Sequence, residues 1–330
     1  MPCLDSLARP INYLRISVTD RCNLRCIYCM PSEGTAPKFR HAEIMTFEEI
    51  VRVVEAAASL GITKIRLTGG EPLARLGIVD LVAMISAVPG IDDIAMTSNG
   101  TLLAHYAEDL KRAGLHRVNI SLDTLGPERF RRITRMGDLS DVLAGIEAAE
   151  RADLRPIKLN NVVMRGFNDD EVVDFARLSL SRDWNVRFIE VMPLGELADS
   201  AEMGYVPIAD VRRRIEAALG PLIPAGEGAQ GNGPARYYRL VDALGTVGFI
   251  SAVSEHFCFR CNRLRLTADG RLRPCLLSDE EIDLRGALRQ GANREELEAL
   301  LQRAIENKPA GHGLAAGMVP QGRSMSQIGG

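Results

Sequence analysis

Short apolar segments alternate with longer amphipathic segments through the first two thirds of the chain. The short segments predict six strands, at residues 13–18, 64–67, 93–97, 117–122, 157–163 and 186–191. The longer segments repeat apolar residues at helical spacing and predict helices at residues 78–87, 102–112, 140–151 and 207–219. Thr46 and Glu49 form a capping-box pattern that opens a further helix ending at Gly61, and Asn168 with Glu171 is expected to open another.

This alternation predicts an α/β fold. A strand, a helix and a parallel strand form the repeating unit of such folds, and a sheet of these units can curl into a TIM-type barrel. Because a complete barrel has eight units, we expect an incomplete (β/α)6 barrel over residues 1–225. Residues 226–330 predict short strands at 236–241, 246–251, 264–267 and 271–275 and helices at 283–290 and 294–307. This small α+β region is expected to close the open side of the barrel.

The composition is that of an ordinary globular protein. Of 330 residues, 46% are hydrophobic and 25% charged, which argues against a disordered or fibrous chain. No segment approaches the ~20 consecutive apolar residues of a membrane span, and no signal peptide is apparent, so we expect a cytoplasmic protein without a membrane partner. The net charge of -3 is too small to attract nucleic acid, so any phosphate binding requires a local cluster of cations.

The first chemical signal is a trio of cysteines. Cys22, Cys26 and Cys29 follow the first predicted strand with CxxxCxxC spacing. In a reducing compartment an odd total of seven cysteines favours metal ligation over disulfides. Structural zinc takes four ligands and iron–sulfur cubes normally take four cysteines, so a trio predicts a metal cluster with one position left open for a ligand.

Cys258, Cys261 and Cys275 form a second trio. A zinc site completed by His256 or Cys3 and a second iron–sulfur cluster are both compatible with this spacing. Five arginines surround the trio, and such guanidinium groups match phosphate oxygens: Arg260, Arg263, Arg265, Arg271 and Arg273. For Arg271 and Arg273 we expect only the alternating charges of an ordinary solvated strand.

Cations also occur within the predicted barrel strands. Arg15, Arg66 and Lys158 lie on strands that should be covered on both faces, where an unpaired charge is costly. An anionic ligand inside the barrel would explain them, and so would salt bridges to Glu71, Asp123 or Glu190. Small and polar residues follow the strand ends, where ligands of α/β folds bind: residues 68–72, 97–100, 121–123, 160–161 and 192–193.

Together these motifs resemble a known family. The cysteine motif with Tyr28 before its last cysteine, and Gly69-Gly70-Glu71-Pro72 after the second strand, are similar to the radical S-adenosylmethionine (SAM) superfamily, whose fold is a partial (β/α)6 barrel. The match to the GTP 3′,8-cyclase family, also called molybdenum-cofactor biosynthesis protein A, extends over residues 15–330. It is carried by residues 20–26, Val191-Met192-Pro193, residues 257–267 with Cys275, and the terminal Gly329-Gly330.

The resemblance implies two 4Fe-4S clusters and SAM as cofactors. It places one cluster on Cys22, Cys26 and Cys29, with its open iron on SAM, and the second on Cys258, Cys261 and Cys275, with its open iron facing guanine. Family positions that contact SAM match Tyr28, Gly70, Ser121 and Met192. Those that contact GTP match Arg15, Arg66, Thr97, Lys158, Arg263, Leu264 and Arg265. The implied catalytic set is Arg15, Arg263, Arg265, Gly329 and Gly330, the last two in a tail that enters the active site.

The implied reaction is homolytic. An external electron donor reduces the first cluster, SAM is cleaved to a 5′-deoxyadenosyl radical, and this radical takes the hydrogen from C3′ of GTP. Attack of C3′ on C8 gives (8S)-3′,8-cyclo-7,8-dihydroguanosine 5′-triphosphate, the first step of molybdenum-cofactor biosynthesis. The resemblance also implies a downstream partner, cyclic pyranopterin monophosphate synthase, and a homodimer. Cys3 has no place in the family pattern and is expected to be a free thiol.

Two other functions are also compatible with these cysteine motifs. Peptide-modifying radical SAM enzymes also carry an auxiliary cluster in a C-terminal extension, although the strand cations argue for a triphosphate. A non-catalytic zinc-binding module would explain the cysteines without any radical chemistry.

Overall fold

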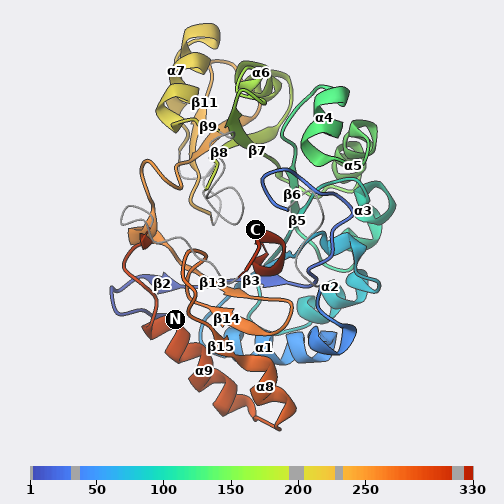
Figure 1. Cartoon of the computed structure of the whole chain (residues 1–330), viewed down its shortest axis with the longest axis vertical. Coiled ribbons are helices and arrows are strands. Elements are labelled where there is room, and N and C mark those ends of the chain that lie inside the picture. The colour runs from blue at the N-terminus through green and yellow to red at the C-terminus, as the bar shows by residue number, and fades with distance from the viewer. Residues whose placement is uncertain (1–2, 31–37, 193–203, 227–232, 314–322, 330) are drawn as a thin grey trace.

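The computed structural model describes residues 3–30, 38–192, 204–226, 233–313 and 323–329. Its main element is one sheet of 13 strands. Parallel pairings join eight of these strands in the order β12-β8-β7-β6-β5-β4-β3-β13. Helices lie around the outside of this arc of strands (Figure 1).

The middle of the sheet confirms all six predicted strands. They are β3 (Tyr13–Ser17), β4 (Lys64–Thr68), β5 (Asp93–Ser98), β6 (Arg117–Ser121), β7 (Ile157–Arg165) and β8 (Trp184–Glu190). The helices that connect them are α1 (Phe47–Ser59), α2 (Ile78–Ser86), α3 (Leu103–Arg112), α4 (Pro127–Thr134), α5 (Leu139–Arg151) and α6 (Val172–Ser181). Only α4 had not been predicted, because it is short and its exposed face carries several arginines.

The C-terminal region extends this sheet at both edges. β12 (Thr246–Ile250) pairs with β8, and β13 (Arg263–Leu266) pairs with β3, both in parallel. Antiparallel strands follow outside them: β10 (Ile223–Pro224), β11 (Arg236–Arg239), β14 (Arg271–Arg273) and β15 (Ile282–Asp283). The C-terminal region, which we expect to close the open side of the barrel, adds strands at both edges of the same sheet; among the described residues the outermost strands β10 and β15 do not pair with each other.

The remaining elements lie on the outside or in the centre. The N-terminal hairpin of β1 (Cys3–Leu4) and β2 (Pro10–Ile11) lies beside α9 (Arg294–Glu306) (Figure 1). The other described elements are the short strand β9 (Gly204–Tyr205) and the helices α7 (Ile208–Leu219), α8 (Leu284–Arg289) and α10 (Met325–Ile328). α10 lies in the middle of the arc of strands (Figure 1). No helix in the described ranges combines the length and apolarity that a membrane span needs.

Local signals at two helix starts had different outcomes. The capping box at α1 is confirmed, since Thr46 accepts a hydrogen bond from the Glu49 amide and Glu49 accepts one from the Thr46 amide. The prediction of a cap by Asn168 at α6 was wrong. Its side chain instead donates to the carbonyl oxygens of Asp123, after β6, and Val162, on β7, because a fully buried amide needs hydrogen-bond partners.

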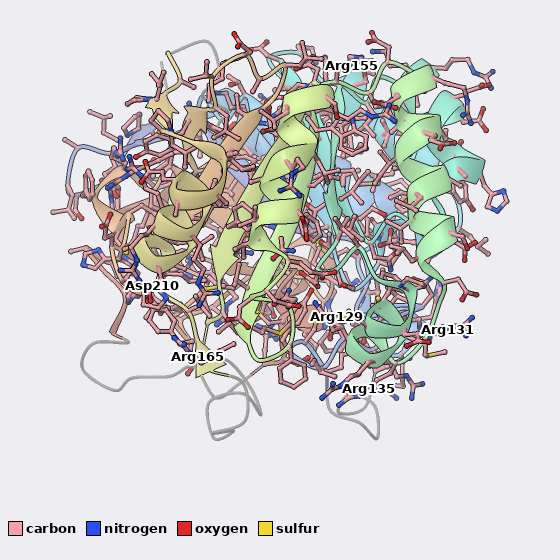
Figure 2. The ribbon with its side chains drawn as sticks, turned by 90° about the horizontal axis from the view of Figure 1, so that it is seen from above. Arg129, Arg131, Arg135, Arg155, Arg165 and Asp210 are labelled. Carbon is pink, nitrogen blue, oxygen red and sulfur yellow. The ribbon has the colours of Figure 1, made fainter. Side chains whose placement is uncertain are left out.

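The two ends of the barrel are distinct. Arg155 lies just before the start of β7 and Arg165 at its carboxyl end, and Figure 2 shows them at opposite ends of the molecule. Arg129, Arg131 and Arg135, on and just after α4, lie at the same end as Arg165 (Figure 2). Since parallel strands share their direction, this is the end at which ligands of barrel folds bind.

Candidate functional site

A cavity of about 320 Å³ lies within the arc of strands. Its volume falls in the range of small-molecule sites, and residues of both cysteine trios line it. The predicted site residues that also line it are Arg15, Tyr28, Arg66, Gly70, Thr97, Ser121, Met192, Arg263 and Arg265. The cavity therefore brings together residues that lie far apart in the sequence, such as Arg15 and Cys275, which are 260 positions apart. None of the seven cysteines is in a disulfide.

The first trio forms one cluster of thiols after β3. Burial and the charge of the neighbouring Cys22 together raise the pKa of Cys29 to about 12. Burial also raises the pKa of Cys26 well above its ordinary value, as do the charges of Asp123, Cys29 and Cys22. Three thiols in mutual electrostatic contact and away from water cannot all ionise unless a positive centre compensates them. This donor set therefore fits an iron–sulfur cluster.

The loop after β4 approaches the cysteine loop very closely. The Gly70 amide donates to the Thr19 carbonyl at 2.7 Å, and the Glu71 amide donates to the Arg21 carbonyl at 2.8 Å. A Cβ atom on Gly70 would lie 2.3 Å from the Arg21 carbonyl oxygen, so only glycine fits there. The two loops are thereby held together as one wall of the cavity.

Glu71 connects that wall to the next strand. Its carboxylate is fully buried and accepts hydrogen bonds from the Ser98 hydroxyl at 2.8 Å and the Asn99 amide at 2.7 Å. Burial raises the pKa of Glu71 to about 7, although these hydrogen bonds act in the opposite direction. The side chain of Asn99 reaches the Cys22 sulfur at 3.8 Å. The polar residues after β4 and β5 thus position the first trio.

Tyr28 is fixed in a similar way. Its hydroxyl donates to Asp123 at 2.8 Å, and the other Asp123 oxygen accepts from the Val162 amide at 2.8 Å. Burial raises the pKa of Asp123 to about 6 and that of Tyr28 well above its ordinary value. The Tyr28 ring therefore lies against the cavity in one fixed orientation.

The second trio lies beside buried cations. Burial raises the pKa of Cys258. At Cys261 burial also acts to raise the pKa, but the charges of Arg263 and Lys308 outweigh it and lower the pKa to about 6. The Leu277 amide donates to the Cys275 sulfur at 3.4 Å. The second trio is therefore better prepared than the first to supply a thiolate ligand.

Two buried side chains hold the segments that carry this trio. The Lys308 ammonium donates to the carbonyl oxygens of Arg263 and Pro274, both at 2.7 Å. Arg9, from the N-terminal hairpin, donates to the Cys258 carbonyl at 2.7 Å and to Pro309 at 2.9 Å. Both cations are only 4% exposed. These contacts fix all three cysteine segments relative to one another. Neither Arg9 nor Lys308 stands in a motif that would have identified it from the sequence.

The arrangement of the thiols favours clusters over single ions. Within the described part of the chain, no three His, Cys, Asp or Glu side chains are close enough to bind one metal ion. A zinc ion needs its ligands about 2.0–2.3 Å from a single centre. In a four-iron cube each cysteine binds a different iron, so its ligands lie further apart. The zinc alternative for the second trio is therefore disfavoured.

Strand cations form a second feature of the cavity. Arg265, Arg15 and Arg66 occupy matching positions on β13, β3 and β4, so they lie side by side across three strands. Burial lowers the pKa of Arg15 well below its ordinary value, and Arg265 lowers it further. Burial and the adjacent Arg263 likewise lower the pKa of Arg265 to about 10. This side of the cavity is strongly positive.

The cationic group extends to β7 and β8. Lys158 is buried, and its ammonium reaches the Tyr237 hydroxyl at 3.5 Å. Burial, together with the charges of Arg187, Arg117 and Arg66, lowers the pKa of Lys158 to about 6. Arg187 lines the cavity at 4% exposure, with its Nε and one terminal nitrogen lacking hydrogen-bond partners.

Arg187 had not been predicted as a site residue. Like Arg15 and Arg66, Arg187 is a charge in a strand covered on both faces, and this is the signal that could have identified it. Glu71, Asp123 and Glu190 were the carboxylates considered as salt-bridge partners of the strand cations, and they bind other groups. Asp123 and Glu71 have the partners described above, and Glu190 accepts from Tyr205, Ile208, Val253 and Ser254. Asp93 is the carboxylate whose charge acts on Arg66 and Lys158.

Several predicted residues take other positions. Leu264 is fully buried in the hydrophobic core, so only its backbone can face a ligand. Arg273 is not on a solvated strand as the sequence suggested, since it is 1% exposed and bound to Glu281, whereas Arg271 is half-buried and pairs with Asp283. Cys3 is a free thiol that donates to Gln302. Pro193 and Gly330 lie outside the described residues.

Two family models match the chain. The radical SAM superfamily matches residues 16–179, and Molybdenum Cofactor Synthesis C matches residues 184–314. A protein named GTP 3′,8-cyclase from Pelotomaculum thermopropionicum is 57% identical over 326 residues, which cover 99% of each chain. The protein of the same name from Heliobacterium modesticaldum is also 57% identical and covers 99% of this chain and 100% of its own.

Solved structures agree on the fold. Streptococcus suis SuiB bound to S-adenosylmethionine aligns with a TM-score of 0.59 at 13% identity and covers 82% of this chain. SuiB bound to the precursor peptide SuiA aligns with a TM-score of 0.61 at 12% identity and covers 91%. The alignments span only 63% and 65% of SuiB, so this likeness concerns the fold alone. The full-length identity to its relatives shows that the chain belongs to the GTP 3′,8-cyclase family of the radical SAM superfamily.

Proposed function

We propose that the protein cyclises GTP to (8S)-3′,8-cyclo-7,8-dihydroguanosine 5′-triphosphate, the first step of molybdenum-cofactor biosynthesis. The observation that supports this most strongly is the single cavity lined by both cysteine trios and by strand cations. One trio alone would fit any radical SAM enzyme. A second trio with a cationic wall between them suits a substrate that carries both a purine and a triphosphate.

The first trio and its loops would hold SAM. When bound to Cys22, Cys26 and Cys29, a 4Fe-4S cluster supplies the electron that cleaves SAM homolytically. The fixed Tyr28 ring and the close approach at Gly70 shape the space beside that cluster. Ser121, the last residue of β6, and Met192, after β8, line the same cavity and complete the proposed SAM contacts.

The cationic wall would hold the triphosphate. Arg66, Lys158 and Arg187 lie on β4, β7 and β8, and the charges of Arg66 and Arg187 both act on Lys158. Each of the three side chains is at most 8% exposed. Placing phosphate oxygens among them relieves the repulsion between buried like charges, which gives the chain a strong preference for a polyanion. The remaining proposed GTP contacts are Arg15, Thr97, Arg263, Arg265 and the backbone of Leu264. A second cluster on Cys258, Cys261 and Cys275 would face the base.

The protein's own contribution to the chemistry is positional. It holds C3′ of GTP near the 5′ carbon of SAM and keeps other hydrogen donors away, because a free radical would react with any of them. Arg15, Arg263, Arg265 and the Gly329-Gly330 tail are the proposed catalytic set. Gly329 meets Arg265 inside the barrel, its carbonyl accepting a hydrogen bond at 2.6 Å.

Further parts of the proposal concern organisation and partners. Residues 1–225 carry the first cluster and residues 226–330 the second. An external donor reduces the first cluster, cyclic pyranopterin monophosphate synthase acts on the product, and the protein works in the cytoplasm as a homodimer. The peptide-modifying alternative lacks support beyond the fold, since SuiB is only 12–13% identical.

Anaerobic turnover tests this function. Reconstituted protein should carry about two 4Fe-4S clusters and convert GTP only when SAM and a reductant are both present. The product should be identified by mass spectrometry and NMR. Formation of 5′-deoxyadenosine without consumption of GTP would refute the substrate assignment.

A further inference from the structure

The cysteine loop of the first trio is attached to the end of α4. The Arg25 amide donates a hydrogen bond to the Thr134 carbonyl at 3.0 Å, and the Ile27 amide donates one to the Ile133 carbonyl at 2.9 Å. Arg25 and Ile27 flank Cys26 in the sequence. The last turn of α4 therefore lies directly outside the loop that carries the first trio.

Arg135, the residue after α4, reinforces this contact. Its guanidinium donates to the carbonyl oxygens of Met30 at 2.8 Å and Arg25 at 3.3 Å, and Met30 directly follows Cys29. The backbone of Arg135 has a φ of +59°, a conformation that residues other than glycine rarely adopt. The hydrogen bonds to the cysteine loop offset the cost of that conformation, so the exposed Arg135 is held at this position.

Further arginines extend this surface along the ligand-binding end of the barrel. Arg132, on the last turn of α4, is exposed, and its guanidinium lies over the Phe167 ring at 5.1 Å. Phe167 follows Arg165, which is exposed at the carboxyl end of β7. Figure 2 shows Arg135 and Arg165 at the same end of the molecule. We call Arg25, Arg132, Arg135 and Arg165 the arginine rim.

The arginine rim carries positive charge that the described part of the chain does not neutralise. Within the described ranges, no carboxylate forms an ion pair with any of its members. Their neighbours on α4 differ, because Arg129 pairs with Asp170 and Glu171, and Arg131 pairs with Asp138. The net charge of the whole chain is only -3, so the rim is a local feature rather than part of a general excess of cations.

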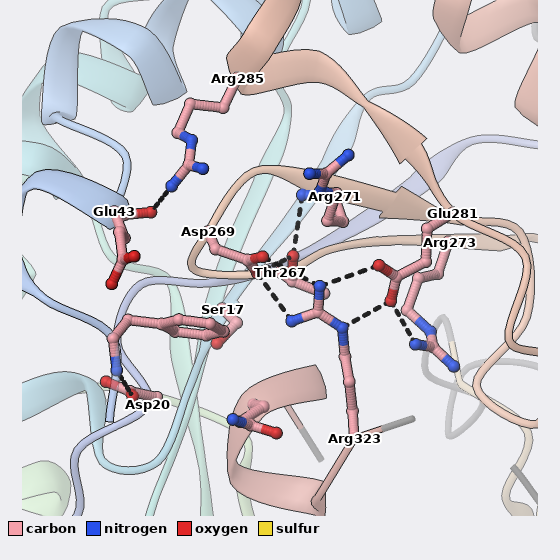
Figure 3. A network of polar contacts seen from close by, with 12 residues as sticks. Ser17, Asp20, Glu43, Thr267, Asp269, Arg271, Arg273, Glu281, Arg285 and Arg323 are labelled. Carbon is pink, nitrogen blue, oxygen red and sulfur yellow. Dashed lines mark hydrogen bonds and ion pairs between the residues drawn. The ribbon is translucent and has the colours of Figure 1, made fainter. Parts of the chain in front are cut away.

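The C-terminal segment shows how an arginine of this chain is bound when it supports the fold. Arg323 donates two hydrogen bonds to Asp269, at 2.8 and 2.9 Å, and two to Glu281, at 2.6 and 2.8 Å (Figure 3). Its side chain is only 12% exposed. The members of the arginine rim have no such carboxylate partners among the described residues. A group of exposed guanidinium groups of this kind is suited to an acidic partner.

We propose that the arginine rim is the docking surface for an acidic one-electron carrier protein, such as a flavodoxin or a bacterial ferredoxin. This inference rests on the proposed function, which needs an external donor for the first cluster. A carrier bound at the rim faces the loop of the first trio from its outer side, because α4 and that loop share hydrogen bonds. In the transfer the carrier loses one electron and the oxidised 4Fe-4S cluster gains it, so no bond forms or breaks.

Reduction of the first cluster by three donors tests the proposal on the reconstituted full-length protein. A reduced flavodoxin and a reduced ferredoxin represent the two kinds of acidic carrier, and reduced methyl viologen is a small cationic donor that needs no docking surface. The rate of reduction is followed by the EPR signal that responds to SAM. With at least one acidic carrier, the rate for the wild-type protein should fall as the ionic strength rises, because salt screens exposed charges.

The double variant Arg132→Gln with Arg165→Gln removes two charges of the rim and leaves Arg135, which supports the cysteine loop, in place. At low ionic strength an acidic carrier should reduce this variant about tenfold more slowly than the wild-type protein, within the roughly 10- to 10³-fold that electrostatic steering contributes. Calorimetric titration with the oxidised carrier should show a dissociation constant raised by a similar factor. Reduced methyl viologen should reduce the variant no more slowly than the wild-type protein, because the rim does not attract a cation.

The matched control is Arg112→Gln with Arg155→Gln, which removes the same charge from the other end of the barrel. Arg112 is the last residue of α3, Arg155 precedes β7, and both side chains are exposed. Figure 2 shows Arg155 at the end opposite to Arg165. All three donors should reduce this control at the wild-type rate. Arg132→Lys with Arg165→Lys keeps the charge of the rim and should keep most of the rate with the acidic carrier.

The outcomes separate this inference from the proposed function. Equal rates for the wild-type protein and the Arg132→Gln, Arg165→Gln variant with the acidic carrier would overturn it, and so would a wild-type protein that neither carrier reduces. A variant that is slower with methyl viologen by the same factor would also overturn it, because the rim would then support the cluster rather than a partner. None of these measurements uses GTP, so a failure to cyclise GTP refutes the proposed function alone.

Discussion

Lys158→Met should abolish a proton uptake that accompanies GTP binding. Burial and the neighbouring arginines lower the pKa of Lys158 from 10.5 to about 6, so at pH 8 the ligand-free protein holds it neutral. If the triphosphate contacts this amine, binding restores its charge. At about 1.36 kcal/mol per pKa unit, protonating Lys158 at pH 8 costs about 3 kcal/mol. That cost grows as the pH rises, so the dissociation constant for GTP should increase about tenfold between pH 7.5 and 8.5.

Calorimetric titration measures this directly. Heats of GTP binding at pH 8 in two buffers with different ionisation enthalpies give the number of protons taken up. We expect the wild-type protein to take up close to one proton for each GTP bound, and Lys158→Met to take up close to none. The dissociation constant of Lys158→Met for GTP should not vary between pH 7.5 and 8.5. Equal proton uptake by the two proteins would refute the assignment of Lys158 to the triphosphate.

The same pKa shift has a consequence for stability. Between pH 6 and 10.5 the folded, ligand-free protein releases a proton from Lys158 that the unfolded chain keeps, so its stability should rise with pH in this window. At pH 7.5 the free energy of unfolding should be lower than at high pH by at most about 4 kcal/mol. Lys158→Met should remove it and flatten the dependence of the melting temperature on pH.

Three further predictions concern the walls of the cavity. Arg187→Met should raise the KM for GTP by about 10- to 10²-fold, since a charge-assisted hydrogen bond contributes ~1.5–3 kcal/mol. The substitution should not lower the melting temperature of the ligand-free protein. An unchanged KM would contradict the assignment of Arg187 to GTP. Gly70→Ala should abolish SAM binding, measured by equilibrium dialysis, because its Cβ would lie 2.3 Å from the Arg21 carbonyl oxygen; binding at wild-type affinity would show that the loop can move. Lys308→Met should reduce the iron content from about two clusters to about one, while the EPR signal that responds to SAM is retained. Lys111→Met, which removes a lysine from an exposed ion pair, serves as its control. Full iron content in Lys308→Met would contradict the role of Lys308.

The barrel could be predicted from the sequence because each strand and helix carries its own pattern. The six central strands are apolar runs, and α1 has a complete capping box at Thr46 and Glu49. The places of β12 and β13 could not be predicted in the same way. They pair with β8 and β3, which precede them by about 60 and 250 residues, and nothing local in a short strand specifies so distant a partner.

The residues of the site also fall into those that the sequence predicts and those that only the fold brings together. The cysteine trios, Tyr28 and Gly70 could be predicted because the spacing of a motif can be recognised in the sequence without any knowledge of the fold. Arg9 and Lys308 could not, because each is an ordinary exposed-type residue in the sequence and becomes a buried support only when the N-terminal hairpin and the end of α9 meet the second trio. Arg323 likewise gains its partners only through the fold.

The central claim is that one cavity places a radical formed at the first trio against C3′ of GTP. The most direct test uses GTP carrying deuterium at C3′, with SAM and a reductant under anaerobic conditions. The account predicts that 5′-deoxyadenosine acquires one deuterium for each molecule of cyclised product. Cyclised product accompanied by unlabelled 5′-deoxyadenosine, or labelled GTP that is not consumed, would contradict it.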